Sequence, residues 1–170
     1  NIAGLIGNIF KYFNFTPNMI TYINIITSIL SIYYLYNYNY KLGALFIFIT
    51  YLLDCCDGYY ARKYNMETHF GDLLDHYTDY IWYMCLIYLY CYRITFKYNY
   101  IIIITLILAI FSILHLSCAE YYNVSNKNAN KTLNNLKPFC INKDYIIYTR
   151  YLGCGTLWTF IIITILFYTK

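Results

Sequence analysis

The chain has 170 residues, of which 61% are hydrophobic and only 12% are charged, with a mean hydropathy of +0.44. Soluble globular domains carry about a quarter charged residues, so this composition excludes an ordinary water-soluble domain. It predicts an all-α, polytopic membrane protein with a single domain over residues 1–170. The formal net charge of +4 comes from basic residues that form no dense cluster, which argues against a nucleic-acid partner.

The two ends of the chain and its cysteines have their own interpretations. The chain begins at Asn1 rather than Met and stops at Lys170, directly after an apolar run, so we expect one or both ends to be trimmed. The seven cysteines mostly lie in apolar segments without metal-type spacing. They are interpreted as small buried hydrophobic side chains, and no disulfide framework is implied.

The first 15 residues are apolar but too short and too interrupted to span a bilayer. Their large apolar side chains share one helical face, which predicts an amphipathic helix lying on the membrane surface; these are Ile2, Leu5, Ile6, Ile9 and Phe13. A signal peptide is the alternative, but the basic flank and the small-residue cleavage pattern are missing.

Five membrane spans are predicted after this helix. Thr16 and Pro17 are typical of a helix start, with Thr16 as the cap and Pro17 in the first turn. The second span begins at about Leu42 and ends at a loop containing Arg62 and Lys63. The others are residues 20–36, 70–92, 101–118 and 145–168, and the Asn- and Lys-rich segment 119–144 is too polar to span.

The distribution of basic residues predicts the orientation. Five spans place the amino terminus, the Arg62–Lys63 loop and segment 119–144 on one side of the membrane. That side has seven basic residues against four on the other, namely Lys11, Arg62, Lys63, Lys127, Lys131, Lys137 and Lys143 against Lys41, Arg93, Lys97 and Lys170. The positive-inside rule then puts the Arg62–Lys63 loop at the cytoplasmic face.

Four aspartates mark a candidate site at this face. Asp54 and Asp57 come at the end of the second span, and Asp75 and Asp79 lie in the first turns of the third. Carboxylates in membrane segments are costly and by default mark a functional site. The spacing puts each pair on one helical face, and a short loop joins the two helices. Four converging carboxylates need a cation between them, and all-oxygen ligands favour Mg²⁺ or Mn²⁺.

Small residues and one arginine accompany these acids. Gly58 and Ala61 share the face of Asp54 and Asp57, whereas Gly71 shares that of Asp75 and Asp79. Such residues let a second helix or a ligand approach the backbone closely. Eight positions then form one pattern of fixed spacing, namely Asp54, Asp57, Gly58, Ala61, Arg62, Gly71, Asp75 and Asp79.

This pattern resembles the signature of the CDP-alcohol phosphatidyltransferase family, with every fixed position filled. The resemblance implies an enzyme of phospholipid biosynthesis that transfers a substituted phosphate group from a CDP-linked donor to an alcohol and releases CMP. It also implies two metal ions at Asp54, Asp57, Asp75 and Asp79, with Asp79 as the general base. The family typically has six spans, so a further one would follow Lys170. A homodimer is what the family suggests.

Nucleotide contacts also follow from the resemblance. Arg62 suits phosphate oxygens, while Gly58, Ala61 and Gly71 leave room for the nucleotide. The run Pro17-Asn18-x-x-Thr21 resembles the opening of the family's first span, in which the Asn and Thr face the nucleotide. It implies that Asn18 and Thr21 do so here.

Three further residues are candidates for substrate contacts. His76 is either a residue of the site's rim or a contact to the alcohol, and His115 is placed to face the site from the fourth span. Arg150 either extends to the membrane interface or binds an acceptor phosphate or headgroup. The run Leu74-Asp75-His76 resembles the choline/ethanolamine branch, whereas Tyr148-Thr149-Arg150 resembles phosphatidylinositol synthases, so the donor and the alcohol stay open.

Two other classes of function fit part of the pattern. A divalent-cation transporter needs the acids but not Gly58, Arg62 and Gly71 at these spacings, and its acids belong near the bilayer midplane. A catalytically dead scaffold of the same fold has no need of four costly carboxylates. The sequence therefore favours the transferase.

Overall fold

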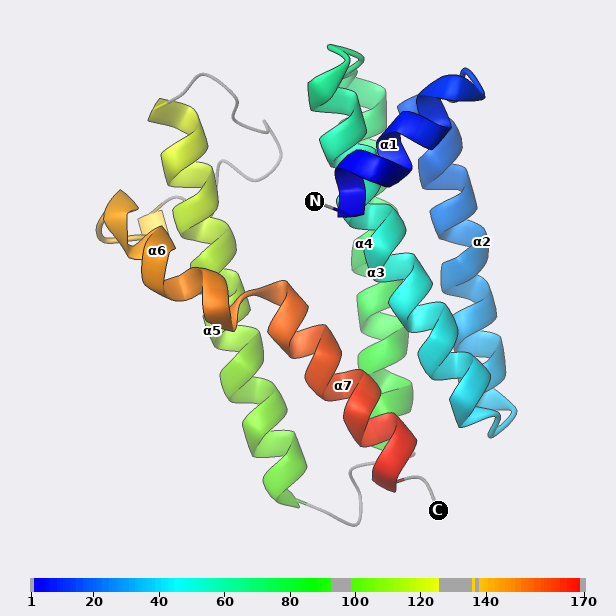
Figure 1. Ribbon diagram of the computed structural model, residues 1–170. Coiled ribbons are helices and arrows are strands. Elements are labelled where there is room, and N and C mark those ends of the chain that lie inside the picture. The colour runs from blue at the N-terminus through cyan, green and yellow to red at the C-terminus, as the bar shows by residue number, and fades with distance from the viewer. Residues whose placement is uncertain (1, 93–98, 126–135, 137, 169–170) are drawn as a thin grey trace. The chain divides into compact units, whose positions relative to one another are not determined.

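The computed structural model describes residues 2–92, 99–125, 136 and 138–168, and within them it contains helices and no strand (Figure 1). The chain forms two compact units, Asn1–Tyr90 and Cys91–Lys170, which are described separately. The all-α class is therefore confirmed, whereas the single domain over residues 1–170 stays a prediction.

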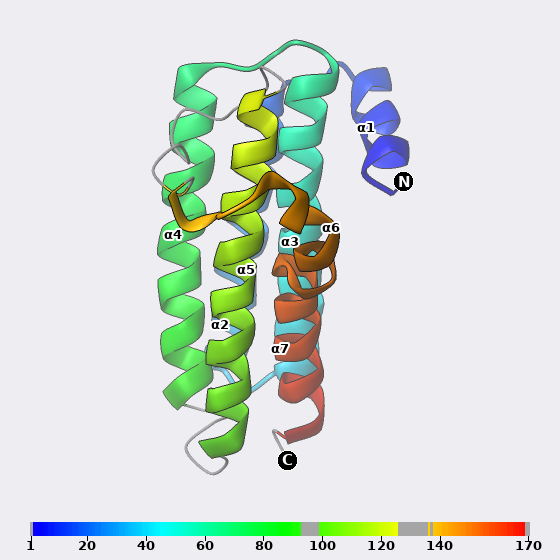
Figure 2. The same ribbon diagram turned by 90° about the vertical axis from the view of Figure 1, so that its left-hand side faces the viewer.

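The first unit consists of four helices, α1 (Ile2–Tyr12), α2 (Pro17–Tyr36), α3 (Tyr40–Lys63) and α4 (His69–Tyr90). Helix α2 packs along α3, as Figure 1 shows, and it also contacts α4. The loop that joins the end of α3 to the start of α4 is seen in Figure 2. A short turn joins α2 to α3, so these two helices run antiparallel. Arg62 and Lys63 lie in the last turn of α3 rather than in a loop, which corrects that prediction.

The start of α2 follows the local sequence signal. Pro17 occupies the first turn, and the Thr16 side chain accepts a hydrogen bond from the Met19 amide at 3.4 Å. This pairing satisfies one of the amides that a helix start leaves without an intrahelical acceptor. The predicted cap is confirmed, and it fixes the residue at which α2 begins.

Helix α1 packs on α3 and presents an apolar face to the surroundings. Lys63 Nζ donates to Asn8 Oδ1 at 2.9 Å, which ties the two helices together. On the opposite face, Leu5, Ile9 and Phe13 are exposed. This matches the amphipathic helix that the sequence predicts, and its position on a membrane surface stays a proposal.

Buried polar side chains link the long helices of the first unit, in addition to its apolar core. Thr50 Oγ1 donates to Thr27 Oγ1 at 3.0 Å across α2 and α3, and Trp82 Nε1 donates to Ser31 Oγ at 2.9 Å across α2 and α4. All four side chains are buried. Hydroxyl groups between helices are a common means of holding membrane helices together, because lipid provides no hydrophobic force between them.

The second unit is built on one long helix, α5 (Asn99–Ser125), which extends seven residues beyond the predicted span. The predicted fifth span is not one continuous helix. It comprises the 3₁₀ turn η3 (Lys143–Tyr145), the short helix α6 (Ile146–Thr149), the 3₁₀ turn η4 (Arg150–Leu152) and the helix α7 (Cys154–Tyr168). Gly153 separates the last two with an extended backbone, φ −76° and ψ −169°.

A disulfide links Cys118 of α5 to Cys140, the latter lying before η3. Both residues are buried. The expectation that the cysteines carry no disulfide is therefore wrong for this pair. The two cysteines are 22 residues apart in the sequence, and no local pattern indicates that they pair.

Four segments are long and apolar enough to cross a membrane, namely α2, α3, Tyr100–Ala119 within α5, and Ile146–Phe167. Four of the five predicted spans are thus confirmed by length and composition. Helix α4 has 22 residues but is not among them. It carries Asp72, Asp75 and Asp79, and its passage through the bilayer stays a prediction. Several basic residues used to predict the orientation lie outside the described residues, namely Arg93, Lys97, Lys127, Lys131, Lys137 and Lys170.

Candidate carboxylate site

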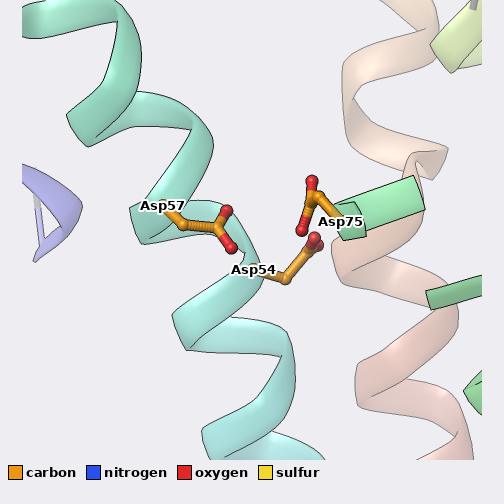
Figure 3. A group of neighbouring side chains, drawn as sticks. All are labelled: Asp54, Asp57 and Asp75. Carbon is orange, nitrogen blue, oxygen red and sulfur yellow. The ribbon is translucent and has the colours of Figure 1, made fainter. Parts of the chain in front are cut away.

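Helices α3 and α4 bring three aspartates together, as Figure 3 shows. Asp54 and Asp57 lie one turn apart on α3, and Asp75 extends toward them from α4. One carboxylate oxygen from each residue can be chosen so that all three lie within 4.8 Å of one another. The predicted convergence of the two acidic pairs is confirmed for these three residues.

Asp57 is the most firmly held of the three. It is only 3% exposed. Its Oδ1 accepts from the Gly58 amide at 2.6 Å, and its Oδ2 accepts from Thr21 Oγ1 of α2 at 3.2 Å. Both oxygens therefore have a donor, and the carboxylate plane is fixed. Thr21, expected to face the nucleotide, holds a carboxylate of the site.

Asp79 lies one turn beyond Asp75 and is not part of the group of three. Its carboxyl group contacts that of Asp54 instead. Asp79 therefore adjoins the cluster from the side of α4. This position is compatible with the expected role of a base beside a metal site, which stays a proposal.

The donor set fits a divalent cation. Within the described residues, no lysine or arginine forms an ion pair with Asp54, Asp57 or Asp75, and the ion-pair geometry found is that of His76 with Asp72. Three close carboxylates without a basic partner repel one another unless a cation lies between them. Oxygen ligands of this kind suit Mg²⁺ or Mn²⁺.

Arg62 folds back over Gly58. A Cβ atom added to Gly58 would lie 3.3 Å from both terminal nitrogens of the Arg62 guanidinium. Because Gly58 has no side chain, the guanidinium of Arg62, one turn later on the same helix, can lie against it. Gly58 directly follows Asp57 in the sequence. The sequence interpretation assigned this space to the nucleotide, and the structure places the Arg62 side chain there. Ala61 is half-buried on α3.

Gly71 marks the close approach of the starts of α2 and α4. A Cβ atom at this position would lie 2.7 Å from Asn18 Oδ1 and 2.9 Å from Thr68 Oγ1. Thr68 Oγ1 accepts from the Gly71 amide at 3.0 Å and so caps α4. The expected site residues Asn18 and Gly71 are thus brought together.

His76 interacts within its own helix. Its Nδ1 lies 2.7 Å from the backbone oxygen of Asp72 and 3.6 Å from Asp72 Oδ1. The sequence interpretation did not include Asp72, although the four-residue spacing to His76 is a usual signal for a side-chain pair on a helix. Contact of His76 with an alcohol substrate stays a prediction.

His115 and Arg150 belong to the second unit. His115 Nδ1 lies 3.1 Å from Thr149 Oγ1, and its ring packs on Gly153, where an added Cβ would be 2.6 Å from Cδ2. Arg150 is exposed and donates to Tyr151 Oη at 2.6 Å. His115 therefore lies at the break between α6 and α7, and the substrate roles of both residues stay predictions.

Several buried polar residues of the first unit escaped the sequence analysis, and Asn24 is the one with an unpaired side-chain oxygen among them. Asn24 of α2 is 1% exposed, and its side-chain oxygen has no hydrogen-bond partner among the described residues. Its spacing of three residues from Thr21 was the available signal. Helical periodicity alone does not distinguish a polar residue at a helix contact from one that faces lipid.

These features define a helical membrane protein with a carboxylate cluster that fits a divalent cation. The chain belongs to the CDP-alcohol phosphatidyltransferase family, whose model matches residues 14–168.

The chain is also similar to individual curated proteins. It is 44% identical over 68 residues to the CDP-diacylglycerol–inositol 3-phosphatidyltransferase of Candida albicans, a stretch that covers 39% of this chain and 29% of that protein. It is 37% identical over 75 residues to the protein of the same name from Rattus norvegicus, covering 44% and 35%. It is 33% identical over 63 residues to the CDP-diacylglycerol–glycerol-3-phosphate 3-phosphatidyltransferase of Aquifex aeolicus, covering 37% and 35%.

The matched stretches span about a third of the length of these relatives. No solved structure matches the chain.

Proposed function

We propose that this protein transfers a phosphatidyl group from CDP-diacylglycerol to an alcohol and releases CMP, in phospholipid biosynthesis. The observation that carries the proposal is the cluster of Asp54, Asp57 and Asp75 within a chain of this family. The names of these relatives give CDP-diacylglycerol as the donor and inositol or glycerol 3-phosphate as the acceptor. This favours a CDP-diacylglycerol donor over a CDP-linked amino alcohol, the other donor class that the sequence left open.

The residues of the site suit this reaction. The acceptor oxygen attacks the phosphorus that bears the diacylglycerol, the bond from this phosphorus to the oxygen of CMP breaks, and CMP leaves as the phosphate. Asp79 accepts the hydroxyl proton at a carboxylate oxygen. Asp54, Asp57 and Asp75, with Asp79 adjoining, would hold Mg²⁺ or Mn²⁺. The metal would neutralise the negative charge of the pyrophosphate.

The remaining contacts orient the nucleotide and the acceptor. The guanidinium of Arg62 provides a planar set of donors for phosphate oxygens beside Asp57. Asn18 and Gly71 lie together where the cytidine part would enter, next to the first turns of α2 and α4. His76, His115 and Arg150 remain the candidates for the acceptor. We place the site at the cytoplasmic face of the membrane, and a homodimer is compatible with the family.

The test is release of CMP by the full-length protein in liposomes with Mn²⁺. CDP-diacylglycerol is offered with inositol and with glycerol 3-phosphate, and CDP-choline is offered with diacylglycerol. Asp79→Asn should lower the rate by about 10²–10⁴-fold, the usual contribution of a general base. The exposed Asp144 provides a matched control, because Asp144→Asn makes the same change of charge outside the site.

Two results would contradict the proposal. One is a lack of CMP release with every pair of substrates from a folded, metal-binding protein, which would favour a cation transporter. The other is an equal rate for Asp79→Asn and the unchanged protein, which would show that Asp79 is not the general base.

A further inference from the structure

Two buried oxygens of the first unit have no hydrogen-bond donor among the described residues. They are Asn24 Oδ1 of α2 and Asp75 Oδ1 of α4. A buried polar atom without a partner is rare in a folded protein and calls for an explanation, such as a bound ion. Asp75 already belongs to the carboxylate cluster, so the question is whether Asn24 lies at the same place.

The contacts between α2 and α3 place Asn24 opposite Asp54. Thr21 of α2 bonds to Asp57, and Thr27 bonds to Thr50. Asn24 is midway between Thr21 and Thr27, and the midpoint between Thr50 and Asp57 falls at residues 53 and 54. Because both helices rise equally per residue, Asn24 and Asp54 lie at the same level.

The contacts between α2 and α4 place Asn24 level with Asp75. Ser31 of α2 accepts a hydrogen bond from Trp82 of α4. Asn24 precedes Ser31 by seven residues, and Asp75 precedes Trp82 by the same number. Residues seven apart share a helical face, so Asn24 faces α4 as Ser31 does. It therefore lies where α3 and α4 present their acids.

The two orphaned oxygens cannot satisfy each other. An amide carbonyl accepts hydrogen bonds, and an ionised carboxylate also only accepts. The neighbouring side chains at this level, Asp54 and Asp57, are acceptors as well. A cation is the partner that satisfies several converging oxygens together, and side-chain carbonyls of asparagine are ordinary ligands of hard divalent cations.

We propose that Asn24 contributes its side-chain carbonyl oxygen as a neutral ligand to a divalent cation held by Asp54, Asp57 and Asp75. This proposal rests on the metal-dependent function proposed above. A neutral ligand adds an oxygen to the coordination without adding a further negative charge beside the three carboxylates and the adjoining Asp79.

The experiment measures Mn²⁺ binding to the full-length protein in detergent without substrate, from the electron paramagnetic resonance signal of free Mn²⁺. Asn24→Ala should raise the dissociation constant by about 10-fold or more, within the range typical for residues that support a metal site. Asn24→Asp should keep the affinity, because it retains an oxygen ligand. Ser28→Ala is the matched control, since it removes a hydroxyl one turn away that bonds to the Asn24 backbone oxygen.

Thermal unfolding with a chelator and then with Mn²⁺ separates a ligand from a structural residue. Asn24 is 1% exposed, so Asn24→Ala loses packing and should unfold at a lower temperature than the unchanged protein even without metal. Added Mn²⁺ should then stabilise Asn24→Ala less. An equal rise in unfolding temperature on addition of Mn²⁺ for Asn24→Ala and for the unchanged protein would assign Asn24 to packing alone and overturn the proposal.

The remaining outcomes are equally decisive. Unchanged Mn²⁺ affinity in Asn24→Ala, with normal binding by the unchanged protein and loss of binding in Asp54→Asn, overturns the role of Asn24 alone. Weakened binding in both Asn24→Ala and Asn24→Asp shows that an oxygen ligand is not what matters, and also overturns it. If the unchanged protein binds no Mn²⁺, the metal-dependent function fails together with this inference.

Discussion

Removal of the Thr21 hydroxyl tests how the carboxylate site is positioned. Thr21 Oγ1 donates to Asp57 Oδ2 at 3.2 Å from a side chain that is 3% exposed. Thr21→Val removes this donor and keeps the shape of the side chain. The other oxygen of Asp57 retains the Gly58 amide at 2.6 Å, so the carboxylate loses one of its two fixed points.

The expected magnitude follows from that geometry. A hydrogen bond to a charged group contributes about 1.5–3 kcal/mol. We assume that half of this free energy is lost from Mn²⁺ binding, because the Asp57 carboxylate is no longer held in position. A loss of roughly 0.8–1.5 kcal/mol weakens Mn²⁺ binding by about 4–12-fold. The unfolding free energy without metal should fall by about 1–2 kcal/mol.

The assay is Mn²⁺ titration together with thermal unfolding in the same detergent. Thr21→Ser serves as the matched control, because it keeps the hydroxyl and should stay close to the unchanged protein in both measurements. If Thr21→Val binds Mn²⁺ as the unchanged protein does, the hydroxyl does not position Asp57 and the reasoning is wrong.

Two further predictions concern Gly71 and the disulfide. Gly71→Ala should be less stable than Gly7→Ala by about 1 kcal/mol, the usual cost of a lost helix cap, as measured by thermal unfolding. A Cβ at Gly71 would lie 2.9 Å from Thr68 Oγ1, which must turn away from the Gly71 amide that it caps. A Cβ at Gly7 meets only ordinary contacts from 3.7 Å. Equal losses in both variants would contradict this role of the Thr68 cap. Maleimide labelling of the denatured protein should count five thiols before reduction and seven after it, because Cys118 and Cys140 are bonded. Seven thiols without reduction would show that this disulfide does not form.

Local signals in the sequence predicted much of the first unit. The Thr16 cap and the following proline set the start of α2 to the residue, because capping depends on neighbours in the chain. The regular spacing of Asp54, Asp57 and Asp75 predicted the carboxylate cluster, since a helix turns these positions onto fixed faces. The loop between α3 and α4 was placed a few residues too early, because Arg62 and Lys63 are good helix formers at a helix end.

Features that depend on packing could not be predicted in the same way. Gly153 breaks the last predicted span where the ring of His115 packs against it, and the apolar sequence on either side reads as one continuous span. The pairing of Cys118 with Cys140 joins residues 22 apart in the sequence, and no local pattern indicates it. Asn24 was missed because its level in the site follows from the register of three helices, which only the contacts of α2 with α3 and α4 establish.

The hydrogen bonds inside the first unit differ in how easily evolution could replace them. The hydroxyls of Thr27 and Ser31 also bond to carbonyls of their own helix, at 2.9 Å and 2.7 Å, so an alanine at either position leaves no stranded group of its own. The single N–H of the Trp82 indole is fixed in place by the ring, and it donates to Ser31 Oγ at 2.9 Å. A threonine hydroxyl can rotate to a carbonyl of its own helix if its partner is lost, so we expect the Thr27–Thr50 contact to vary more in related sequences, whereas residues 31 and 82 should change together.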